Sequence, residues 1–386
     1  MDIYFLICAQ IKIIIIMTYI NIDYNWLFDI LKIVFRWRIN MRNHGIDLLR
    51  LVLMYMVCVL HVLSQGGIIR ASIDGSLGFS VFCILDIICN CAVDGFALIS
   101  GYTAIDKPQK YSKLVNMWFQ VFFYSFILTA IFTIVGLKSD FTIAQMIKSC
   151  FPVLFTKYWY FTAYFGLFLA MPVLNKFIFS IDKQTAKKAF IVICAVFSCM
   201  EILRFPFNTN NGYSFIWLII LYLIGGLIKK INLFEKTKSK NLILIWLICV
   251  LVSYGAYQLL GTNMLINYVS PTILLIGIIM VILFSRLKIN SKIIQKLSPL
   301  AFGIYLLQLN SVLWSYLYDA FGFVVNLNIV FGFLCCLAIA LGMFIAGLIV
   351  ESLRVKLAKI LRISKLSDYI VLFMNKTVNK LCVLLK

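Results

Sequence analysis

The stretch that decides the fold is RNHGIDLLRLVLMYMVCVLHVLSQGG, residues 42–67, an apolar run that contains Arg50 and His61. A helix that crosses about 30 Å of hydrocarbon needs about 20 predominantly apolar residues. Runs of this kind recur along the 386-residue chain, in which 63% of the residues are hydrophobic, 13% are charged and the mean hydropathy is +1.00. These values are typical of an integral membrane protein.

The spacing of apolar runs and charged breaks predicts an all-α integral membrane protein, a bundle of about ten transmembrane helices with a basic amphipathic C-terminal tail. The expected spans are 46–65, 79–101, 115–136, 158–179, 189–206, 213–228, 241–260, 269–285, 300–318 and 328–350. Only short polar loops separate them. We therefore expect one membrane domain over residues 42–352, between an N-terminal extension, 1–41, and a cytoplasmic tail, 353–386.

The two flanking segments differ in character. The extension is apolar over residues 3–20 but interrupted by Lys12, and it lacks the small-residue cleavage pattern of a signal peptide. It is an extra or interfacial helix, or else the chain starts naturally at Met41. In the tail, basic residues alternate with Leu and Ile, which favours contact with anionic lipids of the inner leaflet as a positional anchor without catalytic duty.

The distribution of basic residues predicts the orientation in the membrane. Four loops, 102–114, 175–188, 229–240 and 286–296, hold 16 Lys and Arg, whereas the other five connections hold five. The positive-inside rule places these four loops, and both ends of the ten-helix core, in the cytoplasm. The net charge of +20 is thus spread among loops beside apolar spans, which does not indicate a nucleic-acid partner.

Two compositional features bear on ligands and source. Twelve cysteines form no CxxC pair and nearly all stand in apolar runs, so neither a metal site nor a disulfide framework is indicated. The abundance of Ile, Lys and Asn is typical of an AT-rich bacterial genome, and the expected location is the bacterial cell membrane.

Arg50 and His61 share one face of the first span. Eleven residues turn a helix through about 1100°, three turns plus about 20°, and rise about 16 Å. Ionisable groups at membrane depth are costly, so they normally face a bundle interior or a watery cavity and indicate a functional site. Two structural alternatives stand beside this interpretation: Arg50 pairs with Asp47 and reaches the inner surface, and His61 is a neutral side chain bonded to a neighbouring helix.

Four stretches carry a resemblance to a known family. GIDLLRLVLMYMVCVLHVL, residues 45–63, resembles the signature of the acyltransferase 3 family of multi-pass membrane O-acyltransferases, whose first core helix carries Arg, ten residues and then His. Arg50 and His61 stand at those two positions. FALISGYTA (96–104), YWYFTAYFGLFLAMPVL (158–174) and SPLAFGIYLLQ (298–308) resemble three further family segments, so the likeness covers about residues 42–350.

The resemblance implies transfer of an acyl group, usually acetyl, from cytoplasmic acyl-CoA to a hydroxyl of a cell-surface or lipid-linked glycan. Acyl-CoA is then a donor substrate, and no cofactor or metal is bound permanently. Histidine, with a pKa of about 6.5, is a suitable general base, and arginine is a suitable ligand for phosphate. We therefore expect His61 to be the general base, Arg50 to bind the donor and Asp47 to orient Arg50.

The chain departs from the family at one position. Relatives often end the last of the four stretches in histidine, where this chain has Gln308. An amide donates and accepts hydrogen bonds but takes no proton at neutral pH. Gln308 is therefore assigned no catalytic part.

Further candidates stand on other spans. Asp86, Asn90 and Asp94 recur every four residues, so one face of the second span is polar. Asp94 either orients His61, lines the donor channel, or holds the bundle together through hydrogen bonds. Gly101 permits close helix contact on the same span.

Three residues are candidate contacts of the donor or acceptor. Ser100 and Tyr102 match the family segment, and Arg204 is a candidate glycan contact or, with Glu201, an interfacial salt bridge. The aromatic run 158–160 is expected to form an interfacial belt, with sugar stacking as the alternative.

Two other functional classes fit the composition. A transporter or flippase of polysaccharide precursors also has ten to twelve apolar helices with buried charges, but the chain shows no convincing internal repeat, and its six prolines offer few helix breaks. A receptor or scaffold without chemistry leaves unexplained why Arg50 and His61 share one face of the first span.

Overall fold

The computed structural model describes residues 42–136, 142–200, 207, 209–261 and 263–384. The N-terminal extension and Arg204 lie outside these residues. The chain divides into two units, Met1–Asn43 and His44–Lys386, and the second holds the fold described below. Throughout the described residues the chain is helical and has no strand, which confirms the all-α class.

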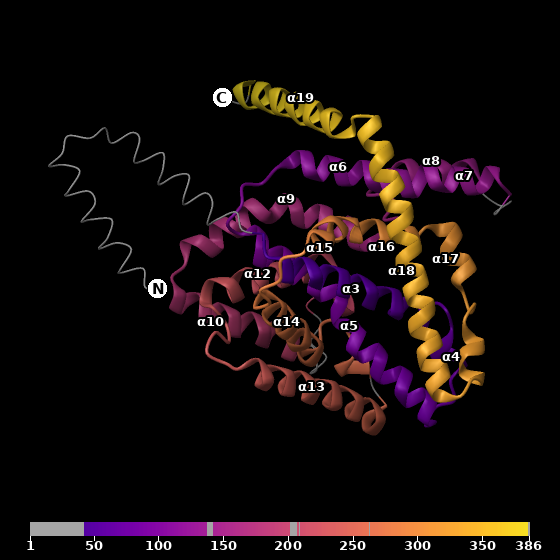
Figure 1. Ribbon diagram of the computed structural model, residues 1–386. Helices are drawn as coiled ribbons and strands as arrows, with labels where there is room; N and C mark the ends of the chain where they lie inside the picture. Colours follow the sequence, from indigo (N-terminus) through magenta and orange to yellow (C-terminus); the bar gives the residue numbers. More distant parts are fainter. Residues whose placement is uncertain (1–41, 137–141, 201–206, 208, 262, 385–386) are drawn as a thin grey trace. The chain divides into compact units, whose positions relative to one another are not determined.

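The helices follow one another along the second unit with short connections (Figure 1). In chain order they are α3 (His44–Leu63), α4 (Ile68–Ala71), α5 (Leu77–Ala104), α6 (Tyr111–Phe122), the π-helix η1 (Phe123–Ile127), α7 (Leu128–Ile134), α8 (Ile143–Cys150), α9 (Trp159–Ser180), α10 (Lys183–Cys194), the π-helix η2 (Ala195–Cys199), η3 (Asn210–Gly212), α12 (Phe215–Ile231), α13 (Ser239–Leu260), η4 (Asn263–Leu265), α14 (Pro271–Ser285), α15 (Lys292–Leu297), η5 (Ser298–Leu300), α16 (Ala301–Gln308), α17 (Ser311–Leu317), η6 (Gly322–Asn326), α18 (Ile329–Ile360) and α19 (Ile363–Leu384).

The expected count of ten membrane spans is not confirmed. Helices occupy the described part of every expected span, but only six in the described chain are long and apolar enough to cross a membrane, or seven if one bent pair is a single span. The shortfall has a geometric reason. At a rise of about 1.5 Å per residue, a helix such as α14, with 15 residues, covers less than the roughly 30 Å of hydrocarbon.

The span expected at 300–318 is broken rather than continuous. The segments Lys292–Gln308 and Ser311–Asn326 are bent by 73°. Asn310 causes the break: its side chain caps α17, and its Nδ2 donates to the carbonyl oxygen of Tyr124, at 2.8 Å, and to Oγ1 of Thr129, at 2.9 Å. An asparagine side chain that bonds backbone groups in this way ends one helix and begins another.

Helix α5 packs against α3, α12 and α14. At its contact with α12 the two backbones touch: a Cβ atom at Gly101 would lie 2.0 Å from the carbonyl oxygen of Tyr222, and one at Gly225 would lie 2.2 Å from that of Leu98. Only glycine allows such an approach. The expected close contact at Gly101 is therefore present, and it fixes α5 beside the cavity described below.

The tail continues the last core helix. Helix α18 runs without a break through the boundary expected at 352/353 and ends at Ile360 (Figure 1). The carboxylate of Glu351, which is buried inside it, accepts hydrogen bonds from Gln120, Tyr124 and Arg354. Helix α19 follows and packs on α6, with Ser367 Oγ 2.9 Å from the Asn116 side-chain oxygen.

Candidate active-site cavity

A cavity of about 940 Å³ lies between α3, α5, α9, α16 and α17. This volume is within the range of sites that hold small molecules and cofactors. Both Arg50 and His61 line it, as do Met54 of the same helix and Ser64 directly after it. The helical spacing thus brings the two ionisable side chains to one space, at different levels along α3.

At the Arg50 end, a buried carboxylate holds the guanidinium. Oδ1 of Asp47 accepts a hydrogen bond from Nη1 of Arg50, at 2.7 Å, and another from Oγ of Ser298, at 3.3 Å. The Asp47 side chain is 1% exposed, whereas that of Arg50 is 31% exposed. The pair therefore holds the arginine at the cavity wall without closing it off, and this contact fits both the orienting role of Asp47 and the structural alternative in which the two residues simply pair.

The surroundings of Arg50 are basic. Partial burial lowers the pKa of Lys107, in the loop after α5, and the positive charges of Arg50, Lys113 and Lys229 lower it further. Asp106 opposes this effect and also pairs with Lys229. Mutual repulsion among these cations is relieved by an anion, so this end of the cavity is suited to a negatively charged ligand.

At the other end, the His61 ring is held by an amide. Nδ1 of His61 lies 2.7 Å from Oε1 of Gln308, and Nε2 of Gln308 donates to Sγ of Cys58 at 2.9 Å. An amide oxygen only accepts hydrogen bonds, so in this arrangement Nδ1 carries the proton. Nε2 is then the ring nitrogen with a lone pair, which is the atom a general base requires.

Gln308 was not identified from the sequence as the partner of His61. It stands at the family position often held by histidine, and its contact with His61 joins residues 247 positions apart in the chain. The signal that could have pointed to this contact is the face of α3 that carries His61, because Cys58, which binds the same amide, lies one turn before His61.

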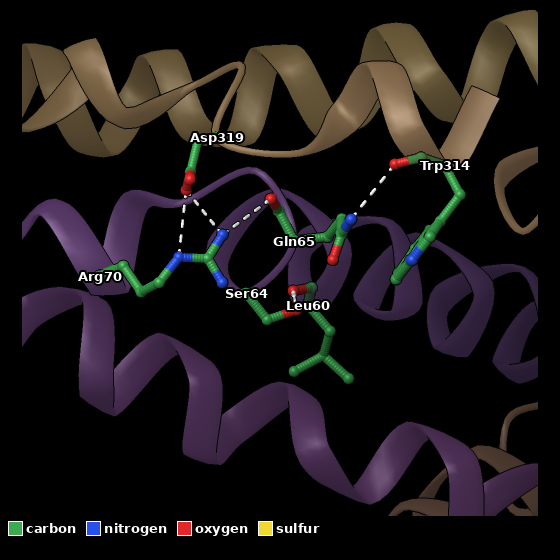
Figure 2. Close-up of polar contacts among 6 residues, drawn as sticks. All are labelled: Leu60, Ser64, Gln65, Arg70, Trp314 and Asp319. Atoms are coloured by element: carbon green, nitrogen blue, oxygen red, sulfur yellow. Dashed lines mark hydrogen bonds and ion pairs between the residues drawn. The ribbon is translucent and has the colours of Figure 1, made fainter. Parts of the chain in front are cut away.

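A polar network fixes the segment that packs on the imidazole (Figure 2). The indole of Trp314 lies edge-on to His61, with ring centroids 5.0 Å apart. The carbonyl oxygen of Trp314 accepts from Nε2 of Gln65 at 3.2 Å. Arg70 in turn donates to the Gln65 carbonyl oxygen and, at 2.6 and 3.1 Å, to Oδ1 of Asp319. These contacts tie the loop after α3 to the segment around α17, whose Trp314 packs on His61.

Asp94 belongs to the helix packing and not to the cavity wall. Its side chain is fully buried, and its Oδ1 accepts from Nε1 of Trp217 at 2.9 Å, which links α5 to α12. Of the three alternatives for Asp94, this contact fits the one in which it holds the bundle together, and the imidazole of His61 is bonded to Gln308. The other two polar residues on this face, Asp86 and Asn90, do line the cavity.

The remaining candidates are placed as follows. Ser100 lines the cavity and donates to the Phe96 carbonyl oxygen. Tyr102 is not among the described lining residues, and its ring lies under the Lys229 ammonium, 5.9 Å from the centroid. Arg204 lies outside the described residues. The aromatic run 158–160 lines the cavity, and Tyr158 is 2% exposed, so these rings do not form the expected belt facing lipid.

These features define a helical membrane protein with a cavity that is lined by both an arginine and an oriented histidine. A family model described as an acyltransferase domain matches residues 43–347, about four-fifths of the chain. The chain belongs to the acyltransferase 3 family, which indicates transferase activity. The match covers Arg50, His61 and Gln308. Comparison with curated proteins and with solved structures gave no match.

Proposed function

We propose that this protein is a membrane O-acyltransferase that moves an acyl group, in the simplest case acetyl, from acyl-CoA to a hydroxyl of a cell-surface or lipid-linked glycan. The observation that carries the proposal is that Arg50 and His61 line one cavity. Along an ideal helix their positions differ by a rise of about 16 Å, so a donor held at one end reaches the other only through an extended arm. The pantetheine arm of coenzyme A is such a group.

His61 acts on the acceptor. Its Nε2 takes the proton of the hydroxyl as the hydroxyl oxygen attacks the thioester carbonyl. The new C–O bond forms, the C–S bond breaks, and the imidazolium returns its proton to the departing coenzyme A thiolate. Atoms and charges balance without a metal or a covalent enzyme intermediate, and coenzyme A leaves as the free thiol.

Gln308 is a positioning residue in this scheme. Its Oε1 holds the Nδ1 proton and so keeps Nε2 as the basic nitrogen. A glutamine fixes one tautomer without itself titrating, so the departure from the frequent family histidine is compatible with the general-base role.

Arg50 and the surrounding lysines bind the anionic donor. Arginine offers a planar fork of donors for phosphate, and Asp47 fixes that fork. The basic loops around Arg50 are those that the positive-inside rule assigns to the cytoplasm, the compartment that supplies acyl-CoA. His61 then faces the acceptor on the exterior of the bacterial cell membrane, with both ends of the core cytoplasmic and the basic tail against anionic inner-leaflet lipids.

An experiment with labelled acetyl-CoA tests the reaction class. Full-length protein in lipid nanodiscs is given acetyl-CoA labelled in the acetyl group and a glycan extract from the source cells. The proposal predicts time-dependent label on glycan, released by mild alkali as expected for an ester. Label that stays on coenzyme A while a lipid-linked sugar crosses the bilayer of reconstituted vesicles supports the transporter or flippase instead.

A further inference from the structure

A second, smaller pocket adjoins the cavity. It has a volume of about 320 Å³, and four residues line both spaces: Asp86, Asn90, Tyr213 and Tyr268. We call it the side pocket, and the rest of its wall includes Phe79, Asn211, Tyr257 and Asn267. A molecule seated in the side pocket therefore lies next to the space that His61 lines.

The polar wall of the side pocket combines a carboxyl group with amides. Nδ2 of Asn90 donates to Oδ2 of Asp86 at 3.1 Å, and Nδ2 of Asn267 lies 3.5 Å from Oδ1 of Asn211. Each amide carries two N–H donors and an acceptor oxygen, and the carboxylate accepts through two oxygens. Such a wall matches a ligand with several hydroxyl groups, each of which both donates and accepts.

The other wall is aromatic. The Tyr213 ring packs against Tyr268 and Trp159, with centroids 5.0 and 4.7 Å apart, and the hydroxyls of the two tyrosines lie 3.3 Å apart. Phe79 and Tyr257 form another ring pair at 6.0 Å. The face of an aromatic ring is electron-rich and attracts the C–H groups that line one face of a sugar ring.

The loop that presents Tyr213 is conformationally strained. Asn210, Asn211 and Gly212 have φ of 49°, 52° and 95°, so three consecutive residues have positive φ. A Cβ atom at Gly212 would lie 2.4 Å from Cβ of Tyr268. Residues held in sparsely populated backbone regions cluster at ligand sites, where the surrounding structure maintains them.

We infer that the side pocket binds one uncharged sugar ring of the acceptor and presents a hydroxyl of that ring to the cavity. This inference rests on the proposed function, since it names the acceptor's subsite. The volume of the side pocket is at the lower end for small-molecule sites, which suits one ring rather than a longer oligosaccharide. The carboxyl group of Asp86 disfavours an acidic sugar, because like charges repel at close range.

The test is saturation-transfer NMR on full-length protein in nanodiscs. The probes are the methyl β-glycosides of glucose, galactose, mannose and N-acetylglucosamine, with methyl β-glucuronide as the acidic counterpart. We expect saturation of the ring protons of at least one neutral glycoside and an at least fivefold weaker signal from the glucuronide. Equal signals from neutral and acidic probes, or none from any neutral probe, would overturn the inference.

Variants locate the bound ring. Asn267→Leu removes amide hydrogen bonds and Tyr213→Ala removes a partly exposed ring, so each should reduce the neutral-probe signal at least fivefold. Asn241→Leu is the matched control, since Asn241 is exposed on α13 and lines neither space. An unchanged signal in both pocket variants would contradict the inference.

Sugar binding in the side pocket and acetyl transfer can fail independently of each other. If the neutral glycosides bind as described but no acetyl leaves acetyl-CoA in the presence of glycan, the subsite stands and the transferase proposal fails. If label reaches glycan but the pocket variants transfer it with an unchanged acceptor KM, the transferase proposal stands and the subsite fails.

Discussion

The amide oxygen of Gln308 accepts a hydrogen bond from Nδ1 of His61 at 2.7 Å, across the contact of α16 with α3. The same amide donates to Cys58, so its orientation is set from the other side. Together these contacts select one tautomer of the imidazole, with the lone pair on Nε2. In the proposed mechanism, the basicity of Nε2 in His61 therefore depends on a residue that does not itself take a proton.

Removing this amide should lower kcat more than it changes the donor KM. We expect Gln308→Leu to reduce kcat by roughly 10- to 100-fold, the range seen when a hydrogen-bond partner of a metal-bound histidine is removed, with the acetyl-CoA KM within about threefold of wild type. Gln308→His should recover much of the loss, because its imidazole can also accept from Nδ1. Steady-state kinetics on the purified variants measure both constants. A Gln308→Leu enzyme with wild-type kcat would rule out the positioning role.

Arg50 should act mainly on the donor. Arg50→Ala is expected to raise the acetyl-CoA KM at least tenfold, and Arg50→Lys should recover only part of it, because an ammonium lacks the planar fork. Asp47→Asn should have a smaller effect in the same direction, since it weakens the anchor at 2.7 Å but leaves the guanidinium in place. An unchanged donor KM in Arg50→Ala would place the coenzyme A phosphates elsewhere.

The basic group around Arg50 should make donor binding sensitive to salt. The pKa of Lys107 is lowered by partial burial and by neighbouring cations, and a bound polyphosphate would relieve that repulsion. Lys107→Gln is therefore expected to raise the acetyl-CoA KM about threefold at low salt and to reduce its dependence on ionic strength. Measuring KM between about 20 and 300 mM salt tests this, and identical salt dependence in the two proteins would contradict it.

The contact of α5 with α12 should tolerate no side chain at Gly101. A Cβ atom there would lie 2.0 Å from a backbone oxygen, so Gly101→Val forces the helices apart and is expected to cost about 1–3 kcal/mol or more. The readout is the thermal unfolding midpoint in detergent. Gly255→Ala on α13 is the control, because a Cβ there meets nothing within 4 Å, and its midpoint should not fall. Equal midpoints for both variants would show that the contact gives way easily.

The local part of the site could be predicted from the sequence. Helical periodicity alone places Arg50 and His61 on one face, because both stand on one element. The same holds for the contact at Gly101, where a small residue in an apolar run indicates close helix packing.

Contacts between distant segments could not be predicted in this way. The partner of His61 is 247 residues away, and the capping bonds of Asn310 that break the expected span 300–318 lie in an apolar context with no Pro beside them. Periodicity left three roles open for Asp94, because it gives a face and not the neighbour on that face, which is Trp217. Apolarity likewise locates helices such as α12 and α14 without showing that they are short.

The most direct measurement compares acetyl transfer by His61→Ala with transfer by His44→Gln, both purified as folded proteins. His44 is the other histidine of the chain, and its Nδ1 accepts a hydrogen bond from the backbone N–H of Ser291 at 2.9 Å. The account predicts that His61→Ala loses transfer at least 100-fold while its Kd for acetyl-CoA stays within about threefold, and that His44→Gln transfers within about twofold of wild type. Near-normal transfer by folded His61→Ala protein would contradict the account.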